Sequence, residues 1–473
     1  MSDQPFQPSS APVPPPPSCQ EPPPLELVTE KLAFGGQAIA RLDRFVYFVD
    51  DALPGETVRA VVYKRKKNFA FARAVEILKA SPDRVPPTCP WMGRCGGCAL
   101  RHCAPAAQLR LKRDILVEAL HALPAAQALV APVVPSPHTD DYRNKMVYSF
   151  GETLDGELRL GLHRRGSYIH ILPADDCLLQ SAASREIVRR TVALANRLHI
   201  GAFHEIKKTA GLRTLMVREA RHTGQRLVEL LATADFPGLA EAFSAEMQGL
   251  ADTVYVSIDH NIRGTPTASD RRLIRGPGYL VETLGGLRFR VGPDTFFQSN
   301  TEQAEALFRA VAEEAVRDGS IPAVALDLFT GTGPIALRLA SASPATRVYG
   351  VESWAPSVEA ARLNAAENHI ANVSFQVADV NRALPPGLPS HADLVVVDPP
   401  RPGLSNAAID WILRMTPADI LYVSCNPSTL ARDLATIAAK APAYVPLAVR
   451  PFDLFPHTYH LETLVHLRLV PFS

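Results

Sequence analysis

The sequence predicts an α/β protein with a doubly wound, Rossmann-like domain at the C-terminus, a small β-barrel near the N-terminus and an α+β domain between them. Three observations lead to this prediction: a length of 473 residues, a C-terminal alternation of strand-like and helix-like segments, and an earlier stretch of short β-type runs separated by turn residues. A chain of this length can form two or three domains, each with its own core.

The first 24 residues are expected to be a disordered tail. They are mostly Pro, Ser and Gln, with four consecutive prolines at 14–17, and such a composition cannot bury a core. Residues 25–84 follow with β-type runs at 45–49 and 57–63, separated by Gly-Gly and Pro-Gly turns. This pattern predicts the barrel.

The last part of the barrel sequence combines cations with aromatic rings. The residues are Lys64, Arg65, Lys66 and Lys67, beside Tyr63, Phe69 and Phe71. Single-stranded nucleic acid is bound by this combination of charge and stacking faces, although a solvated hairpin loop is an alternative interpretation. The net charge of +1 argues against a nonspecific polycation and is compatible with a local basic patch.

The composition also indicates the cellular compartment and the role of the cysteines. We see neither an apolar run near the roughly 18 residues of a membrane span nor a secretory start. A cytoplasmic protein without a membrane partner is therefore expected, as a monomer. Seven cysteines are an odd number in a long chain, which favours metal ligation or catalysis over a disulfide scaffold.

The central region, 85–285, contains a cysteine cluster and a helix-like stretch at about 105–123. Cys89, Cys95 and Cys98 are separated by five and then two residues, and Cys177 is a distant fourth thiol. Four sulfurs can hold either a [4Fe–4S] cluster or tetrahedral zinc, and both remain open from the spacing alone. Because all four positions would be occupied by protein sulfurs, we expect no redox step at this site.

Residues 286–473 have the most regular pattern. Strand-like runs at 323–328, 347–351, 373–377, 393–397 and 420–423 alternate with helix-like segments, which predicts a doubly wound parallel sheet. The first run ends in Asp327-Leu328-Phe329-Thr330-Gly331-Thr332-Gly333, where glycines permit a tight turn close to a nucleoside. Glu352 ends the second run, 19 residues after Gly333, and can accept both ribose hydroxyls.

The glycine spacing alone would also fit a dinucleotide site, so neighbouring carboxylates decide the cofactor. Asp327 directly precedes the glycine loop, where it could hold the amino group of methionine. Asp379 follows the third strand, placed for adenine, and Asp398 begins the sequence Asp398-Pro399-Pro400-Arg401 after the fourth. Together these residues favour S-adenosylmethionine over NAD.

Cys425 and Glu462 are the candidate catalytic pair. Cys425 follows the fifth strand and therefore lies at the carboxyl edge of the sheet, where ligands bind; a buried structural cysteine is the alternative, but Asn426-Pro427 ends the strand at once. Glu462 adjoins a final apolar strand, where a carboxylate is costly unless paired or used. A thiolate that adds to carbon 6 of uracil activates carbon 5 toward a sulfonium methyl, and a base then removes the carbon 5 proton. We hypothesise that Cys425 is the nucleophile and Glu462 the base, with Asp398 orienting the base or the cofactor.

The C-terminal motifs resemble the RNA 5-methyluridine methyltransferase family of class I methyltransferases. The matching segments, in the family's order, are Phe296 to Asn300, Asp327 to Gly333, Asp398 to Gly403, Ser424 to Pro427 and His457 to Glu462. The resemblance implies that the methyl-donor pocket is lined by Gln298, Phe329, Glu352, Asp379 and Asp398, with Cys425 as nucleophile and Glu462 as base. Pro334 stands where the family usually has Asn, which puts in doubt one polar contact with the cofactor.

The front half resembles a subgroup of that family with a TRAM domain and an iron–sulfur site. Residues 25–84 are similar to the TRAM domain, and Cys89, Cys95, Cys98 and Cys177 match the cluster cysteines. The resemblance implies a [4Fe–4S] cluster and 23S ribosomal RNA as substrate. Because four thiolates would leave the cluster no open position, we expect it to have a folding or RNA-docking role. It also relates the run Tyr142-Arg143-Asn144-Lys145 to a segment that faces RNA, although such a run is more often a solvated face.

Several alternatives remain open for the function. These are a transfer RNA uridine methyltransferase, a non-catalytic RNA-binding ribosome-assembly factor, and methylation of cytosine carbon 5 or of a nitrogen. The pair Cys425 and Glu462 argues against a binding module. Arg401 replaces the aromatic residue of nitrogen methyltransferases, and we do not find the cysteine motif of cytosine enzymes.

Overall fold

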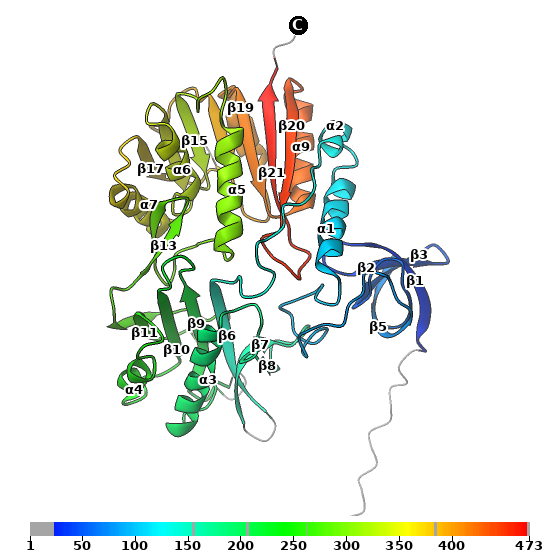
Figure 1. Ribbon diagram of the computed structural model, residues 1–473, viewed down its shortest axis with the longest axis vertical. Helices are drawn as coiled ribbons and strands as arrows, with labels where there is room; N and C mark the ends of the chain where they lie inside the picture. Colours follow the sequence, from blue (N-terminus) through cyan, green and yellow to red (C-terminus); the bar gives the residue numbers. More distant parts are fainter. Residues whose placement is uncertain (1–22, 154–156, 205–207, 262, 383–385, 471–473) are drawn as a thin grey trace, which may run out of the picture. The chain divides into compact units, whose positions relative to one another are not determined.

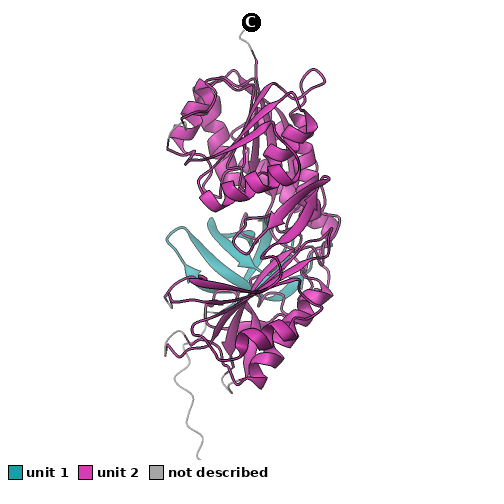
Figure 2. Cartoon of the chain, turned by 90° about the vertical axis from the view of Figure 1, so that its left-hand side faces the viewer, with its two compact units in different colours: residues 1–33, 37–82 teal, residues 34–36, 83–473 magenta. Residues whose placement is uncertain are grey.

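The computed structural model describes residues 23–153, 157–204, 208–261, 263–382 and 386–470. Most of the expected N-terminal tail, including Cys19, lies outside the described residues. Of the described residues, 23–33 and 37–82 form one compact unit, and 34–36 with 83–470 form a second (Figure 2). None of the helices within these ranges combines the length and the apolarity needed to cross a bilayer.

The first unit is a closed five-stranded barrel, as the sequence predicts. Its strands are β1 (Leu25–Leu32), β2 (Ala38–Leu42), β3 (Phe45–Asp50), β4 (Thr57–Arg65) and β5 (Phe69–Lys79), in the order β1-β2-β3-β5-β4. The interior is filled by small side chains, among them Ala38, Ala60 and Ala72, which are completely buried. Small residues at inward-facing positions suit a barrel of few strands, since its interior is narrow.

The second unit contains a central seven-stranded sheet in the order β12-β11-β10-β9-β6-β7-β8. The elements are β6 (Lys145–Glu152), β7 (Leu158–His163), β8 (Ile171–Pro173), α3 (Ala182–Arg197), β9 (Leu212–Glu219), β10 (Arg226–Ala232), α4 (Leu239–Glu246), β11 (Thr253–Ile258) and β12 (Asp270–Arg275). Helices α3 and α4 pack on it through Ile187 and Phe243, which are completely buried. A mostly antiparallel sheet covered by helices on one side is the predicted α+β arrangement.

The C-terminal domain is built on a second seven-stranded sheet, in the order β17-β16-β15-β18-β19-β21-β20 (Figure 1). The elements are α5 (Thr301–Glu314), β15 (Val324–Leu328), α6 (Pro334–Ala342), β16 (Arg347–Glu352), α7 (Ala355–Glu367), β17 (Val373–Val377), β18 (Leu394–Val397), α8 (Asn406–Arg414), β19 (Asp419–Ser424), α9 (Pro427–Lys440), β20 (Tyr444–Phe452) and β21 (Glu462–Leu469). Strands β15 to β19 are parallel, and β21 runs antiparallel to both β19 and β20. The predicted doubly wound fold is confirmed.

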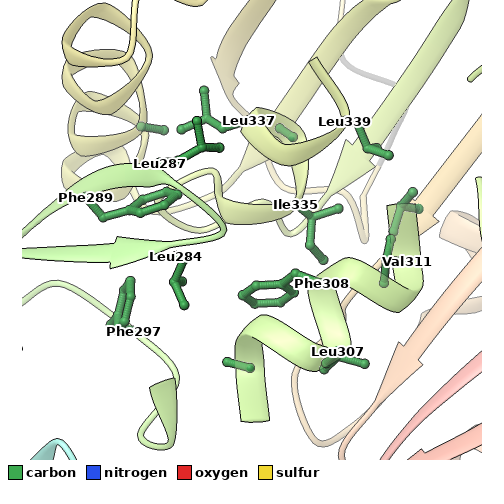
Figure 3. Close-up of a cluster of buried hydrophobic side chains, with 14 of the residues drawn as sticks. Leu284, Leu287, Phe289, Phe297, Leu307, Phe308, Val311, Ile335, Leu337 and Leu339 are labelled. Atoms are coloured by element: carbon green, nitrogen blue, oxygen red, sulfur yellow. The ribbon is translucent and has the colours of Figure 1, made fainter. Parts of the chain in front are cut away.

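Alternate residues of each central strand face opposite sides of this sheet. Ala325 and Val423 belong to the core shared with α5, α6 and α7, whereas Leu326 and Tyr422 belong to the core shared with α8 and α9. Figure 3 shows the first core, where α5 and α6 meet the hairpin of β13 (Leu280–Leu284) and β14 (Leu287–Val291). Buried parallel strands need apolar residues on both faces, which explains the continuous apolar runs.

Two helices from the central part of the sequence pack against the C-terminal domain. Helix α1 (Pro105–Ala119) contacts α9, and α2 (Pro124–Ala128) contacts β20. Leu116, Ala126 and Val130 are buried in the same apolar core as Ile420 and Tyr422 of β19. The chain therefore covers one face of the C-terminal sheet before it forms the central sheet.

Candidate functional site

The loop between β15 and α6 is a tight turn at the carboxyl edge of the C-terminal sheet. Phe329, Gly331 and Gly333 all have positive φ, at 64°, 55° and 86°. A Cβ on Gly333 would lie 2.9 Å from Cζ of Phe375, so both the backbone conformation and the space require glycine. Pro334 occupies the first turn of α6, where the missing N–H has no intrahelical partner to lose.

Asp327 lies completely buried beneath this loop. Its Oδ2 accepts hydrogen bonds from Thr330 Oγ1 at 2.5 Å and from the Ala336 N–H at 2.9 Å, whereas Oδ1 is buried and has no partner among the described residues. Burial raises the pKa of Asp327 to about 7. An unsatisfied buried acceptor is costly, so the geometry fits a ligand that supplies an N–H donor, such as the amino group of methionine.

A cavity above the loop brings together Asp327 and three of the predicted cofactor residues. Gln298, Phe329 and Asp398 line it with Asp327, and so does Pro334. These predicted cofactor residues and Asp327 thus reach this cavity from three places: the end of β15, the end of β18 and the segment before α5.

Glu352 and Asp379 stand at the ends of β16 and β17 and are not among the residues that line this cavity. The Glu352 carboxylate accepts the N–H of Gly331 at 3.3 Å and that of Trp354 at 2.9 Å. The Asp379 carboxylate accepts the N–H of Asn381 at 3.0 Å. Both acidic residues therefore lie at the carboxyl edge of the sheet, and Glu352 contacts the glycine loop.

Gln298 is held in place by Asn144, a residue that the sequence placed in an RNA-facing run. Asn144 is 5% exposed. Its Nδ2 donates to the Gln298 carbonyl and to Thr301 Oγ1, both at 2.8 Å, and its N–H donates to the Ser299 carbonyl at 2.9 Å. Nothing in the local pattern indicated this role, because the partners lie about 150 residues further along the chain.

Cys425 is half-buried in the turn between β19 and α9. Asn426 caps α9 by accepting the Ser428 N–H at 3.0 Å, and Pro427 follows in the first turn. The Arg401 carbonyl accepts from Asn426 Nδ2 at 3.4 Å and from Thr429 Oγ1 at 3.2 Å. These bonds join the loop after β18, which carries Asp398, to the turn that carries Cys425.

Glu462, the first residue of β21, is 4% exposed. Its pKa is raised well above the usual value by burial and then by Asp398, while Arg401 opposes the shift. Burial, Glu462 and Asp398 together raise the pKa of Cys425 to about 11. The two predicted catalytic residues and Asp398 therefore share one electrostatic environment.

The shifted pKa values of the carboxylates and histidines at this site determine which of them can act as bases. Burial and Asp327 raise the pKa of Asp398 to about 7. A carboxylate of raised pKa is a stronger base toward a weakly acidic proton. Burial lowers the pKa of both His457 and His460 to about 4, so neither imidazole is a cation near neutral pH.

Four cysteines line a second cavity in the same unit. Cys89, Cys95, Cys98 and Cys177 face it together with Arg101. Burial, followed by the charges of the other three thiols, raises the pKa of Cys177 to about 11. Within the described ranges, no three His, Cys, Asp or Glu side chains form a group suited to a single metal ion.

In the barrel unit, cations lie over the faces of aromatic rings. Lys64 Nζ is 5.8 Å from the centroid of Phe71, and the guanidinium of Arg65 is 4.6 Å from that of Phe45. Tyr63 is 53% exposed and stacks beside Phe71. Tyr63 and Lys64 of β4 therefore contact Phe71 of β5, whereas Arg65 lies over Phe45 of β3.

Comparisons with known proteins agree with this architecture. The sequence model of the tRNA (uracil-5-)-methyltransferase family matches residues 389–470, a methyltransferase domain matches 325–402 and the TRAM domain matches 27–75. An RNA methyltransferase of Gloeobacter violaceus is 38% identical over 92% of this chain and 94% of its own, and one of Halalkalibacterium halodurans is 33% identical over 94% and 97%.

A solved structure is similar over nearly the whole chain. It is the tRNA (uracil-54, C5)-methyltransferase of Pyrococcus abyssi in complex with S-adenosyl-L-homocysteine, which is 27% identical, with a TM-score of 0.75, over 94% of this chain and all of that one. Barrel, cofactor domain and sequence relatives agree, and the chain belongs to the S-adenosylmethionine-dependent RNA (uracil-5-)-methyltransferase family.

Proposed function

We propose that this enzyme methylates carbon 5 of a uridine in 23S ribosomal RNA through a covalent adduct with Cys425, and that Glu462 removes the carbon 5 proton. The observation that carries the proposal is the shared environment of Cys425, Glu462 and Asp398 beside the cavity that contains Asp327. A non-catalytic RNA-binding protein would have no use for a half-buried thiol beside the carboxylates of Glu462 and Asp398, because each carboxylate disfavours the charged form of the thiol.

The proposed reaction has two stages. Cys425 Sγ bonds to carbon 6 of the uracil, and the electron pair of the 5,6 double bond moves toward oxygen 4, so that carbon 5 becomes nucleophilic. When bound, S-adenosylmethionine supplies a methyl group on a positively charged sulfonium. After carbon 5 has bonded to the methyl group, Glu462 takes the carbon 5 proton, the 5,6 double bond re-forms and the Cys425 thiolate leaves.

The residues of the cofactor site fit the methyl donor. The unpaired Oδ1 of Asp327 is an acceptor for an ammonium group, and Gln298, Phe329 and Asp398 line the same cavity. We assign Glu352 to the ribose and Asp379 to the adenine, because both stand on the edge where ligands of doubly wound sheets bind.

We further propose a [4Fe–4S] cluster at Cys89, Cys95, Cys98 and Cys177. Four thiols around one cavity support this assignment. Burial raises the pKa of Cys98, and the positive charge of Arg101 opposes this rise and would favour a thiolate ligand. Zinc is the alternative occupant. Anaerobic purification distinguishes them: iron and sulfide with a broad visible absorbance support the cluster, and stoichiometric zinc without iron contradicts it.

A transfer RNA substrate is the second candidate. The choice of ribosomal RNA rests on the resemblance of the barrel and the four cysteines to the ribosomal subgroup. The Pyrococcus abyssi enzyme, named for transfer RNA, nevertheless matches 94% of this chain, so a related architecture also serves that substrate. In either case we assign initial RNA contact to the barrel face of Tyr63, Lys64, Arg65 and Phe71.

The test is transfer of labelled methyl groups from S-adenosylmethionine to unmodified ribosomal and transfer RNA, with analysis of the product nucleoside. The wild-type protein should form 5-methyluridine in the large-subunit RNA, and Cys425→Ala should form none. Glu462→Gln should methylate once and then retain the RNA in an adduct that survives denaturation. Full activity of Cys425→Ala, or a product methylated on nitrogen or on cytosine, would contradict the mechanism, and label confined to transfer RNA would contradict the substrate.

A further inference from the structure

The segment between β20 and β21, residues 453–461, leads directly into Glu462, and we call it the base loop. Its centre is His457, whose φ of 63° lies in the left-handed region. A residue with a Cβ holds this conformation only when its surroundings fix it. The contacts that fix His457 therefore bear on the position of Glu462, five residues later.

The backbone of His457 is held by the segment that carries the cysteines. The N–H groups of Ala99 and Leu100, directly after Cys98, both donate to the His457 carbonyl at 2.9 Å. Arg101, the next residue, is itself held in place, because its guanidinium lies 2.6 Å from the Asp140 carboxylate. His457 therefore joins the segment that carries the cysteines to the loop that leads to Glu462, the proposed base.

Gln108 on α1 completes the connection. This side chain is 2% exposed. Its Oε1 accepts the His457 N–H at 2.9 Å, while Nε2 donates to the carbonyls of Leu100 at 3.1 Å and Cys103 at 2.8 Å. One buried amide therefore binds both the base loop and the cysteine segment, across 349 residues of sequence.

Other contacts fix the first half of the base loop. Lys112, one turn after Gln108 on α1, is completely buried and lies 2.5 Å from Asp453. Tyr142 donates to the Pro456 carbonyl at 3.2 Å, and Asn300 Nδ2 donates to the Leu454 carbonyl at 3.1 Å. The base loop is thus positioned from outside the sheet to which Glu462 belongs.

We propose that Gln108 is a positioning residue for Glu462, and that the four-cysteine site acts on the reaction by holding the base loop through Ala99 and Leu100. This inference rests on the proposed function, in which Glu462 removes the carbon 5 proton. It gives the occupant of the cysteine site a task besides folding: the distance from Glu462 to the substrate depends on the order of residues 98–103. No electron transfer is involved.

The experiment uses the full-length protein with Gln108→Met, which keeps the length of the side chain and removes its hydrogen bonds. The control is Gln127→Met, since the partly buried Gln127 on α2 also donates to a backbone carbonyl, that of Val117 at 2.9 Å. Amide hydrogen exchange should rise in the peptides that cover 453–461 and 98–103 in the first variant only. Iron, sulfide or zinc content should match that of the wild type in both.

The second measurement compares the rates of two reaction stages, formation of the methylated adduct and release of methylated RNA. It uses labelled S-adenosylmethionine and the RNA that the wild type methylates. Because misplacement by about 1 Å can cost about a hundredfold in rate, we expect release of methylated RNA from Gln108→Met to slow at least tenfold. Formation of the methylated adduct should stay within about twofold of the wild type, since Cys425 lies on other elements. A general loss of structure would lower both stages together.

Wild-type exchange in the base loop of Gln108→Met, with release as fast as in Gln127→Met, would overturn the inference. If Gln108→Met does not fold, Gln108→Glu decides by the same measurements, because it keeps an oxygen acceptor for the His457 N–H and removes the amide nitrogen that contacts the Leu100 and Cys103 carbonyls and His457 Nδ1. If Glu462→Gln retains no adduct, the assignment of the base is wrong, and the exchange data alone then decide whether Gln108 supports the base loop.

Discussion

In the ligand-free protein, the thiol of Cys425 should ionise only in strongly alkaline solution, and its alkylation reports this directly. Burial and the carboxylates of Glu462 and Asp398 raise its pKa from an ordinary 9.0 to about 11. At pH 8 the thiolate fraction is then roughly a hundredfold smaller than for an ordinary cysteine. A thiolate of higher pKa is intrinsically about tenfold more nucleophilic, so the net rate at pH 8 should be about tenfold lower.

The assay is reaction with iodoacetamide between pH 7 and 11, followed by mass spectrometry of the peptide that contains Cys425. The shape of the profile is the decisive quantity, because limited access lowers the rate equally at every pH. The rate should rise about tenfold for each pH unit up to pH 10 and level off near 11. Asp398→Asn removes one negative charge, lowers the pKa of the thiol and should increase alkylation at pH 8.

A profile that levels off below pH 9, or an Asp398→Asn variant that reacts more slowly at pH 8, would refute the electrostatic reasoning. The first result would mean that the free protein already holds a thiolate. The second would mean that Asp398 acts on Cys425 through structure and not through charge.

Three further predictions concern stability and ligands. Lys112→Met leaves Asp453 as an unpaired buried charge and should lower the free energy of unfolding by about 3–5 kcal/mol, measured by chemical denaturation. The double variant Lys112→Met with Asp453→Leu should recover most of that loss. Equal destabilisation of the single and double variants would contradict this prediction. In Gly350→Ala the new Cβ would lie 2.5 Å from Phe375 Cδ1 and 3.1 Å from Thr330 Cγ2. We therefore expect about 1–3 kcal/mol of destabilisation and a smaller thermal shift on addition of S-adenosylhomocysteine. A thermal shift equal to that of the wild type would contradict the prediction. Because the pKa of Cys177 is raised to about 11, metal binding at this site must displace protons from the thiols. Dialysis against a chelator should therefore remove more metal at pH 6 than at pH 8. Equal retention of metal at the two pH values would show that these thiols are not the ligands.

The parts of the site that the sequence predicted share a simple geometric reason. Asp327, Asp398 and Cys425 each follow an apolar run of a parallel sheet, and the carboxyl ends of parallel strands lie on one edge. Local patterning therefore sufficed to bring three distant residues together. The predicted strands coincide with β15 to β19 within one residue at each end, since continuous apolar runs bounded by Gly, Pro and Asp leave little choice of register.

What the sequence could not predict depends on contacts between distant segments. Helix α1 was visible as a helix-like stretch, but nothing local indicated that it packs on α9 and binds the base loop. Asn144 and Gln108 look like ordinary polar residues in their segments, because a buried hydrogen bond to a remote backbone group leaves no periodic pattern. The strand order β19-β21-β20 was likewise hidden, since an antiparallel insertion at the edge of a parallel sheet depends on the return of the chain and not on its composition.

The unusual pKa values at the sheet edge have one common explanation. Asp327, Asp398, Glu462 and Cys425 are all acidic groups whose charged forms are disfavoured by burial and, in part, by one another. A positive charge bound among them would favour the ionised forms, and the sulfonium of the methyl donor carries such a charge. In the proposed mechanism, a bound donor would therefore favour both the Glu462 carboxylate that acts as base and the Cys425 thiolate that acts as nucleophile.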